Sequence, residues 1–336
     1  MRAAIMDAPG AMRVGEWATP RPGPGEVLVE VRAAGICAGD MYIYLGKNPY
    51  AVYPQVCGHE IAGVVAALGA GVGAPEPGTL VAVEPFLGCG GCYPCRVGKP
   101  NCCANLQIIG VHRPGGYAEY VVAPATHVHP APPGLSALDA SFAEPLAVAL
   151  QACRRGQVAA GEHVLVLGCG PIGLALIEVL RARGAQVTAA DLLPERLDTA
   201  AQLGAEALPA GPELLPAILA RTGGEGAPVV IEATGNPRAM EQTVDLVAAG
   251  GRVVIVGLVP QGVGVTFPGL DFTRKELTVL GSRASAGCFP EALALLASGA
   301  ITYPRLATAF GMWEAPAVFA DLAARPSRVH KGVLLR

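Results

Sequence analysis

The feature that most constrains the fold is a run of glycines directly after a short apolar segment. The segment His163–Leu167 leads into Gly168–Gly173 and then into an apolar stretch with helical spacing. In a Gly-x-Gly-x-x-Gly turn the first glycine permits a tight turn, the second lets a pyrophosphate approach the backbone, and the third lets the helix pack closely on the strand. The helix N-terminus then faces the phosphate charge. The residues predicted to contact a dinucleotide here are Gly168, Gly170, Pro171, Ile172 and Gly173.

An acidic residue follows at the distance that such a turn requires. Asp191 ends the next predicted strand, 23 residues after Gly168. An acid at this point accepts hydrogen bonds from ribose hydroxyls and repels a 2′-phosphate, which favours NAD over NADP. A helix N-cap is a second role for Asp191, compatible with the first. Arg196, five residues later, is expected over the adenine or the ribose.

Two regions of different periodicity divide the chain. Before residue 147, short alternating runs lie between Gly/Pro turns, which indicates a β-rich domain. After it, helical stretches alternate with short apolar strands up to about residue 286, which predicts βαβ units and a parallel sheet. We therefore expect an α/β chain with a β-rich domain at 1–146, to which 287–336 return, and a doubly wound coenzyme domain at 147–286. Residues 208–212 are expected to form a surface loop.

Composition narrows the classes of function. The chain has 336 residues, 52% hydrophobic and 15% charged, with a net charge of −3. No block of Lys and Arg is present, which argues against a nucleic-acid or membrane-surface partner. A long uncharged run, Val253–Leu270, is interrupted by Pro and Gly and is expected to be strand and loop. Because Asp7, Pro9 and Gly10 interrupt any signal-peptide pattern, we expect a cytoplasmic protein with reduced cysteines.

Four of the ten cysteines lie in one 15-residue segment. The spacing is Cys89-x2-Cys92-x2-Cys95-x7-Cys103, among glycines. Such a loop can wrap a tetrahedral ion, and four thiolates suit zinc in a closed structural site. Cys102 is an alternative fourth ligand. Because four thiolates leave no open position, this site is expected to stabilise its domain and not to catalyse.

A second set of metal-binding residues is dispersed along the chain. It comprises Cys37, the pair His59-Glu60, and Glu144 before a proline. Spacing alone is weak support, because a lone His is more often a satisfied core residue and Glu144 could be a helix-start acid. One thiolate, one carboxylate and a neutral imidazole would leave Zn²⁺ formally neutral with an open position. Asp40 would then accept from the free ring N–H of His59, or else cap its loop.

Together these motifs resemble the zinc-dependent medium-chain dehydrogenases, in the polyol (sorbitol) dehydrogenase branch. Cys-x-x-Asp, Gly-His-Glu, the four-cysteine loop, Glu-Pro-Leu and the glycine turn follow in that order over nearly the whole chain. The resemblance implies a GroES-like catalytic domain, a Rossmann coenzyme domain and a homodimer or homotetramer. Glu144 indicates the branch, because simple alcohol dehydrogenases carry a second Cys there.

The resemblance also implies a ligand set and coenzyme contacts. A catalytic zinc falls on Cys37, His59 and Glu60 and/or Glu144, with Cys153 as the rival fourth ligand, and a structural zinc on Cys89, Cys92, Cys95 and Cys103. The catalytic zinc would act as a Lewis acid on a secondary hydroxyl of the substrate. The hydride from the carbon that bears this hydroxyl would pass to the nicotinamide of NAD across the gap between the two domains. The segments expected to contact the coenzyme there contain Thr234, Val256, Gly257, Ser282 and Arg283.

One position departs from the family pattern. Two residues after the zinc-binding Cys the family usually has a Ser or Thr that relays the substrate's proton, whereas this chain has Gly39. Water or another hydroxyl must fill that role. Tyr42 falls where related enzymes often carry a relay His, and Tyr44 is near. We therefore hypothesise that Tyr42 relays the proton.

Three further segments narrow the expected substrate. Residues 46–54, 109–120 and 281–290 resemble bacterial L-gulonate or L-galactonate 5-dehydrogenases and starvation-sensing dehydrogenase-like proteins. A sugar acid needs a cation for its carboxylate and hydrogen-bond partners for its hydroxyls. The resemblance favours Arg283, with Arg113 and Lys47 as weaker candidates.

The expected activity is therefore zinc- and NAD-dependent oxidation of a small polyol or sugar acid. L-Threonine or butanediol dehydrogenase is the alternative within enzymes, because those activities share the same site logic with different pockets. A structural or regulatory NAD-binding protein is the non-catalytic alternative, and Gly39 is the feature that favours it.

Overall fold

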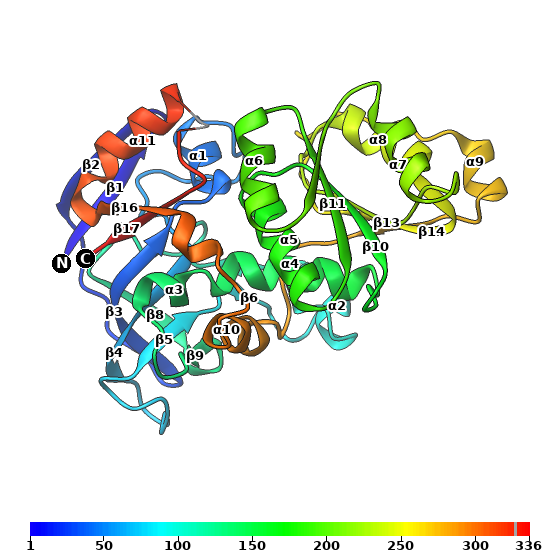
Figure 1. Cartoon of the computed structure of the whole chain (residues 1–336). Coiled ribbons are helices and arrows are strands. Elements are labelled where there is room, and N and C mark those ends of the chain that lie inside the picture. Colours follow the sequence, from blue (N-terminus) through cyan, green and yellow to red (C-terminus); the bar gives the residue numbers. More distant parts are fainter. Residues whose placement is uncertain (326–327) are drawn as a thin grey trace. The chain divides into compact units, whose positions relative to one another are not determined.

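The computed structural model describes residues 1–325 and 328–336 and separates into two compact units (Figure 1). Unit 1 consists of Met1–Ala147, Ala286–Gly299 and Pro304–Arg336, and unit 2 of Val148–Ser285 and Ala300–Tyr303. One part of the expected division differs, because residues 300–303 belong to unit 2. The reason is Glu178, whose buried carboxylate accepts the backbone N–H groups of Thr302 and Tyr303 at 2.8 and 2.6 Å.

Unit 2 is built on a six-stranded parallel sheet. Its strands are β10 (His163–Leu167), β11 (Gln186–Asp191), β12 (Glu206–Pro209), β13 (Ala227–Glu232), β14 (Val247–Ile255) and β15 (Thr278–Gly281). They lie in the order β12-β11-β10-β13-β14-β15, which is the 3-2-1-4-5-6 order of a dinucleotide-binding fold. The helices of this part of the chain are α4 (Ala143–Arg155), α5 (Pro171–Ala182), α6 (Pro194–Gln202), α7 (Leu214–Arg221), α8 (Pro237–Leu246) and α9 (Gly269–Arg274). The α/β class predicted from the strand–helix alternation is confirmed.

The central strands of unit 2 are apolar along their length because both faces are covered. Leu165, Val230 and Val253 are fully buried in one core cluster. Burial on both faces is the environment that a parallel sheet between helices provides. The loop expected at 208–212 is wrong at its start, because β12 continues through Pro209. Proline is tolerated there because Pro209 ends an edge strand, where the missing N–H removes little pairing.

Unit 1 contains a seven-stranded sheet and two small hairpin sheets. Its strands are β1 (Arg2–Ala8), β2 (Ala11–Glu16), β3 (Glu26–Gly35), β4 (Glu60–Leu68), β5 (Leu80–Val83), β6 (Phe86–Leu87), β7 (Gln107–Ile108), β8 (Tyr120–Pro124), β9 (Val128–Pro130), β16 (Ala307–Gly311) and β17 (Lys331–Leu335). The large sheet has the order β16-β17-β3-β4-β5-β9, with β8 also paired to β3. All its pairs are antiparallel except β16 with β17.

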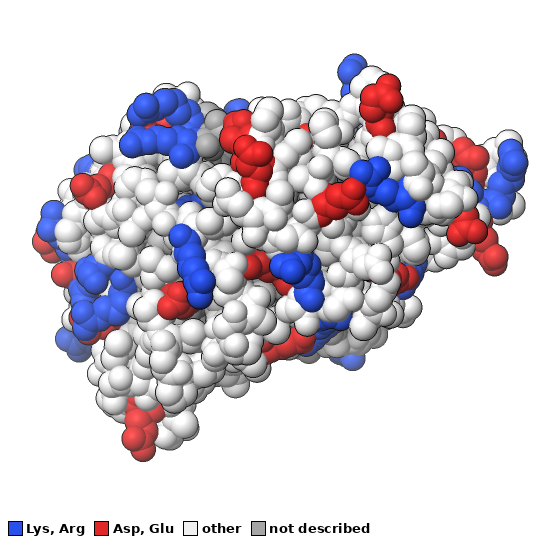
Figure 2. Space-filling model, viewed as in Figure 1, with Lys and Arg blue, Asp and Glu red and all other residues white. Residues whose placement is uncertain are grey.

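Short helices connect and cover these strands. They are α1 (Ala38–Tyr44), α2 (Tyr93–Arg96), η1 (Pro100–Cys102), η2 (Ala125–His127), α3 (Ala137–Ser141), α10 (Phe289–Ala297), η3 (Tyr303–Leu306), η4 (Met312–Glu314) and α11 (Ala315–Ala324). No helix in the described part of the chain is both long and apolar enough to cross a bilayer. On the face drawn in Figure 2, acidic and basic side chains are interspersed over a largely uncharged surface.

Strand register brings distant residues of unit 1 together. Gly35 at the end of β3 pairs with Glu60 at the start of β4, and Val333 of β17 pairs with Gly35 from the other side. Cys37 follows β3 by two residues, and His59 directly precedes β4. Three segments separated by up to about 300 residues of sequence therefore meet around the end of β3.

Candidate metal and coenzyme sites

Three metal-binding side chains meet beside the end of β3. One ligand atom each from Cys37, His59 and Glu60 lies within 4.8 Å of the others. His59 and Glu60 are buried and Cys37 is partly exposed. Helix α1 begins directly after Cys37, whose Sγ accepts the backbone N–H of Gly39 at 3.4 Å. The helix start thus fixes the sulfur.

Asp40 lies behind this cluster and is fully buried. Its Oδ2 accepts the backbone N–H of Cys37 at 2.9 Å and lies 2.8 Å from the hydroxyl of Tyr117, which donates to it. Its Oδ1 lies 3.5 Å from Nδ1 of His59 and accepts the backbone N–H of Gly58 at 3.3 Å. One carboxylate therefore caps the turn that carries the sulfur and also lies close to the imidazole. Tyr117 was not found by sequence reasoning, because nothing local marks it.

The electrostatics of this cluster favour a positive charge at its centre. Burial acts to raise the pKa of Asp40, but His59 and the hydrogen bonds from Cys37 and Tyr117 bring that pKa below its ordinary value. Burial acts to lower the pKa of His59, but Asp40 and Cys37 raise it well above its usual range. A thiol, an imidazole and a carboxylate in such surroundings fit a divalent zinc ion.

The two candidate glutamates are not equivalent. Glu60 belongs to the group of atoms within 4.8 Å, whereas Glu144 of α4 does not. Glu144 is fully buried, and burial first, then the charges of Glu60 and Asp40, raise its pKa to about 7 against the opposing effect of His59 and Lys331. Cys153 is buried and lies outside both groups of metal-binding atoms found in the described chain.

The position of the missing hydroxyl opens onto the cluster. A Cβ built on Gly39 would lie 3.7 Å from Cε1 of His59 and 3.8 Å from Sγ of Cys37, which are ordinary contact distances. Tyr42 is 47% exposed, and its hydroxyl makes no hydrogen bond to any residue that the structure describes. Tyr44 is instead buried against Phe319, with ring centroids 5.6 Å apart.

The four-cysteine loop folds into a compact sulfur cluster. The sulfurs of Cys89, Cys92, Cys95 and Cys103 all lie within 4.8 Å of one another. Cys92 Sγ is 3.5 Å from that of Cys95 and 3.7 Å from that of Cys103. A tetrahedron with Zn–S bonds of about 2.3 Å places its sulfurs about 3.8 Å apart. The sulfur geometry therefore fits a zinc ion without rearrangement.

Backbone N–H groups surround these sulfurs. Cys103 Sγ accepts the N–H groups of Cys89 and Asn105, both at 3.2 Å. N–H donors of Cys95 and Ala104 lower the pKa of Cys92 to about 6, whereas desolvation raises that of Cys95 to about 11. Cys102, the alternative ligand, is exposed and outside the cluster. All ten cysteines lie in the described chain and none forms a disulfide.

In unit 2 each glycine of the turn has a distinct steric reason. Gly168 has φ +96°, and a Cβ there would lie 2.7 Å from Cγ2 of Thr234. A Cβ on Gly173 would lie 1.8 Å from the carbonyl oxygen of Gly168, so the helix packs directly on the turn. A Cβ on Gly170 would meet nothing within 4 Å, and α5 begins at the next residue, Pro171. The open space at a helix N-terminus suits a phosphate.

Asp191 ties this turn to the end of β11. Its Oδ2 accepts the N–H of Cys169 at 2.7 Å, and its Oδ1 accepts that of Leu193 at 3.0 Å. Arg196 Nη1 lies 3.6 Å from the same Oδ2. A carboxylate and a guanidinium therefore lie side by side at the end of β11.

Glu232 ends β13 and is not among the residues that the sequence singled out. It is fully buried, and its Oε1 accepts the N–H groups of Thr234 and Gly235 at 2.6 and 3.0 Å, together with the Thr234 hydroxyl. Its backbone carbonyl accepts the N–H groups of Val256 and Gly257 at 2.9 and 3.1 Å. Glu232 therefore holds together the two segments expected beside the nicotinamide.

The remaining candidates lie near or at the surface. Ser282 is buried after β15, with no hydrogen-bond partner for its hydroxyl among the described residues, and Arg283 beside it is exposed. Arg113 is half-exposed, with Nη1 3.8 Å from Oε1 of Glu26, and Lys47 is exposed.

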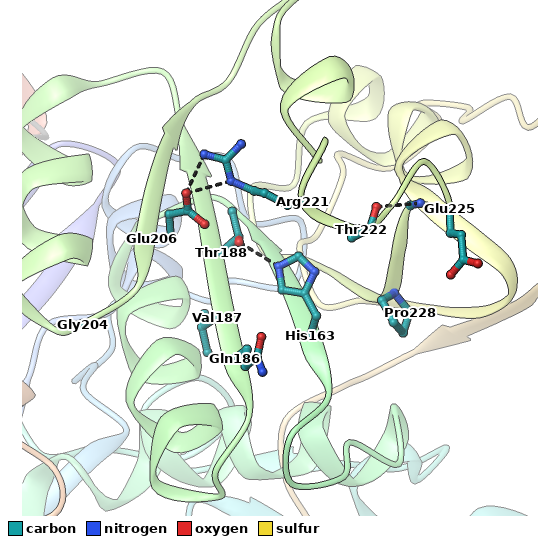
Figure 3. Close-up of a pocket in the computed structure, with 11 residues that line it drawn as sticks. His163, Gln186, Val187, Thr188, Gly204, Glu206, Arg221, Thr222, Glu225 and Pro228 are labelled. Carbon is teal, nitrogen blue, oxygen red and sulfur yellow. Dashed lines mark hydrogen bonds and ion pairs between the residues drawn. The ribbon is translucent and has the colours of Figure 1, made fainter. Parts of the chain in front are cut away.

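A separate pocket of about 560 Å³ lies at the amino ends of the strands of the unit 2 sheet (Figure 3). It is lined by residues at the amino ends of β10 to β13, including His163 and Glu206, and by Arg221 at the end of α7. Glu206 accepts two hydrogen bonds from Arg221, at 2.7 and 2.5 Å. Because the glycine turn follows the carboxyl end of β10, this pocket is not the coenzyme site.

Comparison with protein families gives two matches. Residues 23–133 match the alcohol dehydrogenase GroES-like domain, and residues 171–298 match the zinc-binding dehydrogenase family. The starvation-sensing protein RspB of Escherichia coli K12 is 37% identical over 311 residues, 92% of this chain and 91% of that protein. L-Galactonate-5-dehydrogenase of the same organism is 39% identical over 292 residues, 86% of this chain and 85% of that protein. An L-threonine 3-dehydrogenase of Pyrococcus abyssi is 39% identical over 269 residues, covering 78% and 76%.

Comparison with solved structures also finds dehydrogenases. RspB of Escherichia coli CFT073 with NADH has a TM-score of 0.93 and 34% identity, covering 100% of this chain and 99% of that one. A zinc-binding dehydrogenase of Sinorhizobium meliloti bound to NADP has a TM-score of 0.92 and 34% identity with the same coverage. The chain therefore belongs to the zinc-dependent medium-chain alcohol dehydrogenase family. It is an oxidoreductase with a GroES-like domain and a Rossmann-like domain, as predicted.

Proposed function

We propose that the chain oxidises a secondary hydroxyl of a polyol or sugar acid at the cluster of Cys37, His59 and Glu60, with NAD as acceptor. The observation that carries this proposal is the group formed by the partly exposed thiol of Cys37 and the buried imidazole and carboxylate of His59 and Glu60, with Asp40 beside the ring. When bound there, zinc supplies a Lewis acid for the substrate's hydroxyl oxygen, and the nicotinamide supplies the hydride acceptor.

The protein's own residues would prepare the site in two ways. Asp40, close to Nδ1 of His59, holds the proton on that nitrogen and leaves the other one for the ion. Cys37 and one glutamate, Glu60 or Glu144, supply the negative charge. The sulfurs of the four-cysteine loop would hold a second zinc that has no open position and stabilises unit 1.

The coenzyme is proposed to be NAD because Asp191 presents a carboxylate and already neutralises Arg196. The contacts would come from the glycine turn and from the segments around Thr234, Val256 and Gly257. Replacing Asp191 with Ala should raise the ratio of kcat/KM with NADP to that with NAD, because Arg196 is then released toward a 2′-phosphate. The matched variant Arg196→Ala should not raise it. An unchanged ratio in Asp191→Ala would contradict the NAD assignment.

The substrate is proposed to be a sugar acid whose carboxylate meets Arg283. Support comes from a relative named for L-galactonate and from the resemblance of the segment around Arg283. Arg283→Ala should raise KM for the acid about tenfold or more, because a hydrogen bond to a charged group is lost. KM for the matching neutral polyol should change little, and Arg113→Ala should leave both unchanged. Equal effects on acid and polyol would remove the carboxylate assignment.

The second candidate substrate is L-threonine, because relatives of that name cover most of the chain. A panel of sugar acids, polyols, butanediol and L-threonine, scored by kcat/KM, decides between them. Turnover of a sugar acid above the others supports the proposal, and preference for L-threonine overturns the substrate class while retaining the reaction. A homodimer or homotetramer is expected, and sedimentation would show it.

The proton is proposed to leave through water or Tyr42. Because Tyr42 is half-exposed and its hydroxyl has no hydrogen bond to the described residues, that hydroxyl can reach solvent or substrate. Tyr42→Phe should lower kcat and alter its pH profile. If both are unchanged, water alone fills the position that Gly39 leaves open.

A further inference from the structure

We propose that Lys331 is the positioning residue that makes Glu60, and not Glu144, the carboxylate that faces the metal. Lys331 opens β17 and is only 3% exposed. Its Nζ donates to Oε1 of Glu60 and to the carbonyl oxygen of Ile36 at 3.0 Å. A lysine is rarely this buried unless its charge is paired, and its partner here is a member of the metal-binding group.

The side chain of Glu60 has little space for any orientation other than the one in which it contacts Lys331. A Cβ on Gly35 would lie 1.8 Å from Oε2 and 2.9 Å from Cδ of Glu60, so the side chain fills the space that this glycine leaves. With Oε1 on Lys331, Oε2 is buried and has no hydrogen-bond partner among the described residues. An unpartnered buried carboxylate oxygen is costly. A cation beside Cys37 and His59 would satisfy it, because a Glu60 oxygen lies within 4.8 Å of both.

Acidic side chains surround the cluster. Asp40 lies 3.5 Å from Nδ1 of His59, and a Glu60 oxygen lies within 4.8 Å of Cys37 and His59. Lys331 brings a basic side chain to this group and pairs with Glu60.

Lys331 therefore acts on the metal through Glu60 and does not contact it. Fixing one carboxylate oxygen presents the other at a constant angle, as hydrogen-bonded partners of metal ligands do. Glu144 has no such cation of its own within hydrogen-bond distance among the described residues and is left as the second, displaced carboxylate. Strand register determines this choice, because β17 pairs with β3 next to Gly35.

The inference rests on the proposed metal site, and Co²⁺ binding tests the two separately. The protein is used as the full chain, with zinc retained in the four-cysteine loop and Co²⁺ titrated into the other site. Visible absorption reports the ligand field, and its growth gives the affinity. If the wild-type chain shows no cobalt–thiolate absorption, the metal site itself is wrong and the proposed function fails with it.

Given wild-type binding, Lys331→Met should weaken Co²⁺ binding about ten- to a hundredfold and shift the absorption bands. In a Glu60→Gln background the same substitution should change the affinity less than about twofold, because Lys331 acts through Glu60. In a Glu144→Gln background its full effect should remain. Lys275→Met is the matched control, because among the described residues that amine donates only to the carbonyls of Val244 and Val247 in unit 2.

Lys331→Gln keeps an N–H donor without the charge and covers the case in which the Met variant does not fold. It should show the same band shift with a smaller loss of affinity. Unchanged bands with only a lower melting temperature, or tighter binding because a repelling charge is gone, would overturn the proposal. Loss of the effect in Glu144→Gln instead of Glu60→Gln would assign the lysine to the other carboxylate and overturn it as well.

Discussion

The two groups of metal-binding side chains in unit 1 are assembled in opposite ways. The four-cysteine loop takes every sulfur from one 15-residue segment and surrounds them with its own backbone N–H groups. The cluster of Cys37, His59 and Glu60 takes its members from the ends of β3 and β4 and places Asp40, Glu144 and Lys331 around them. A local loop can close on an ion completely. A site built from distant segments instead acquires charged neighbours, which can tune an ion that keeps an open position.

The largest expected effect separates the two groups by function. Cys37→Ser should lower kcat/KM at least about a thousandfold, since a Lewis acid contributes several kcal/mol to such a step. Its melting temperature should stay near that of the wild type. Cys95→Ser should do the reverse, with a much lower melting temperature and nearly normal kcat in the protein that remains folded. Enzyme assays and calorimetry on both variants make the comparison. A Cys37→Ser variant with kcat/KM within tenfold of the wild type would refute it.

Metal removal should distinguish the groups by rate. An ion with three protein ligands and an open position can bind a chelator before it leaves, whereas four thiolates leave no such opening. Activity should therefore disappear with the first zinc released, and the melting temperature should fall only with the second. Zinc content, activity and melting temperature are followed in the same samples over time. The comparison breaks if stability and activity decline together from the first ion.

Restoring a hydroxyl at position 39 should raise kcat moderately, through the cluster of Cys37, His59 and Glu60 alone. A side chain at Gly39 meets His59 and Cys37 at ordinary contact distances, so Gly39→Ser should fold normally. Because a positioned acid–base group contributes about a hundredfold or more at full efficiency, part of that gain, about three- to tenfold in kcat, is expected. Gly39→Ala is the steric control. Equal kcat in the Ser and Ala variants would show that the relay already has its hydroxyl elsewhere.

The smallest effect belongs to an ion pair of unit 2 that is part of neither metal group. Arg221 lowers the pKa of Glu206 by hydrogen bonding to it. A depressed carboxyl pKa adds stability above the unfolded-state value, and that stability is lost as pH falls through the folded-state pKa. Glu206→Gln should therefore reduce stability by less than about 1 kcal/mol at pH 7, because the pair is largely exposed. The difference in melting temperature should vanish in acid. A larger loss, or one that persists in acid, would mean that the pocket of Figure 3 has a structural role.

The sequence could predict features that depend on residues close together in the chain, and it could not predict those that depend on contacts between distant residues. The α/β class rests on local signals, namely the glycine turn and the alternation of strand and helix, and it is confirmed. Lys331 and Tyr117 were beyond prediction because their partners are reached only through strand pairing and loop packing. Residues 300–303 belong to unit 2 for the same reason, since nothing near them in the sequence marks Glu178. Which of the two glutamates, Glu60 or Glu144, faces the proposed metal likewise depends on the register of β17 against β3.

Diffraction at the zinc absorption edge, on crystals of the zinc-loaded chain, tests the central claim most directly. The account predicts two anomalous peaks per chain. One should lie about 2.3 Å from Sγ of Cys37 and about 2.0–2.2 Å from a His59 nitrogen and a Glu60 oxygen, and the other about 2.3 Å from four cysteine sulfurs. A single peak in the four-cysteine loop, with Cys37, His59 and Glu60 contacting only protein, would contradict it.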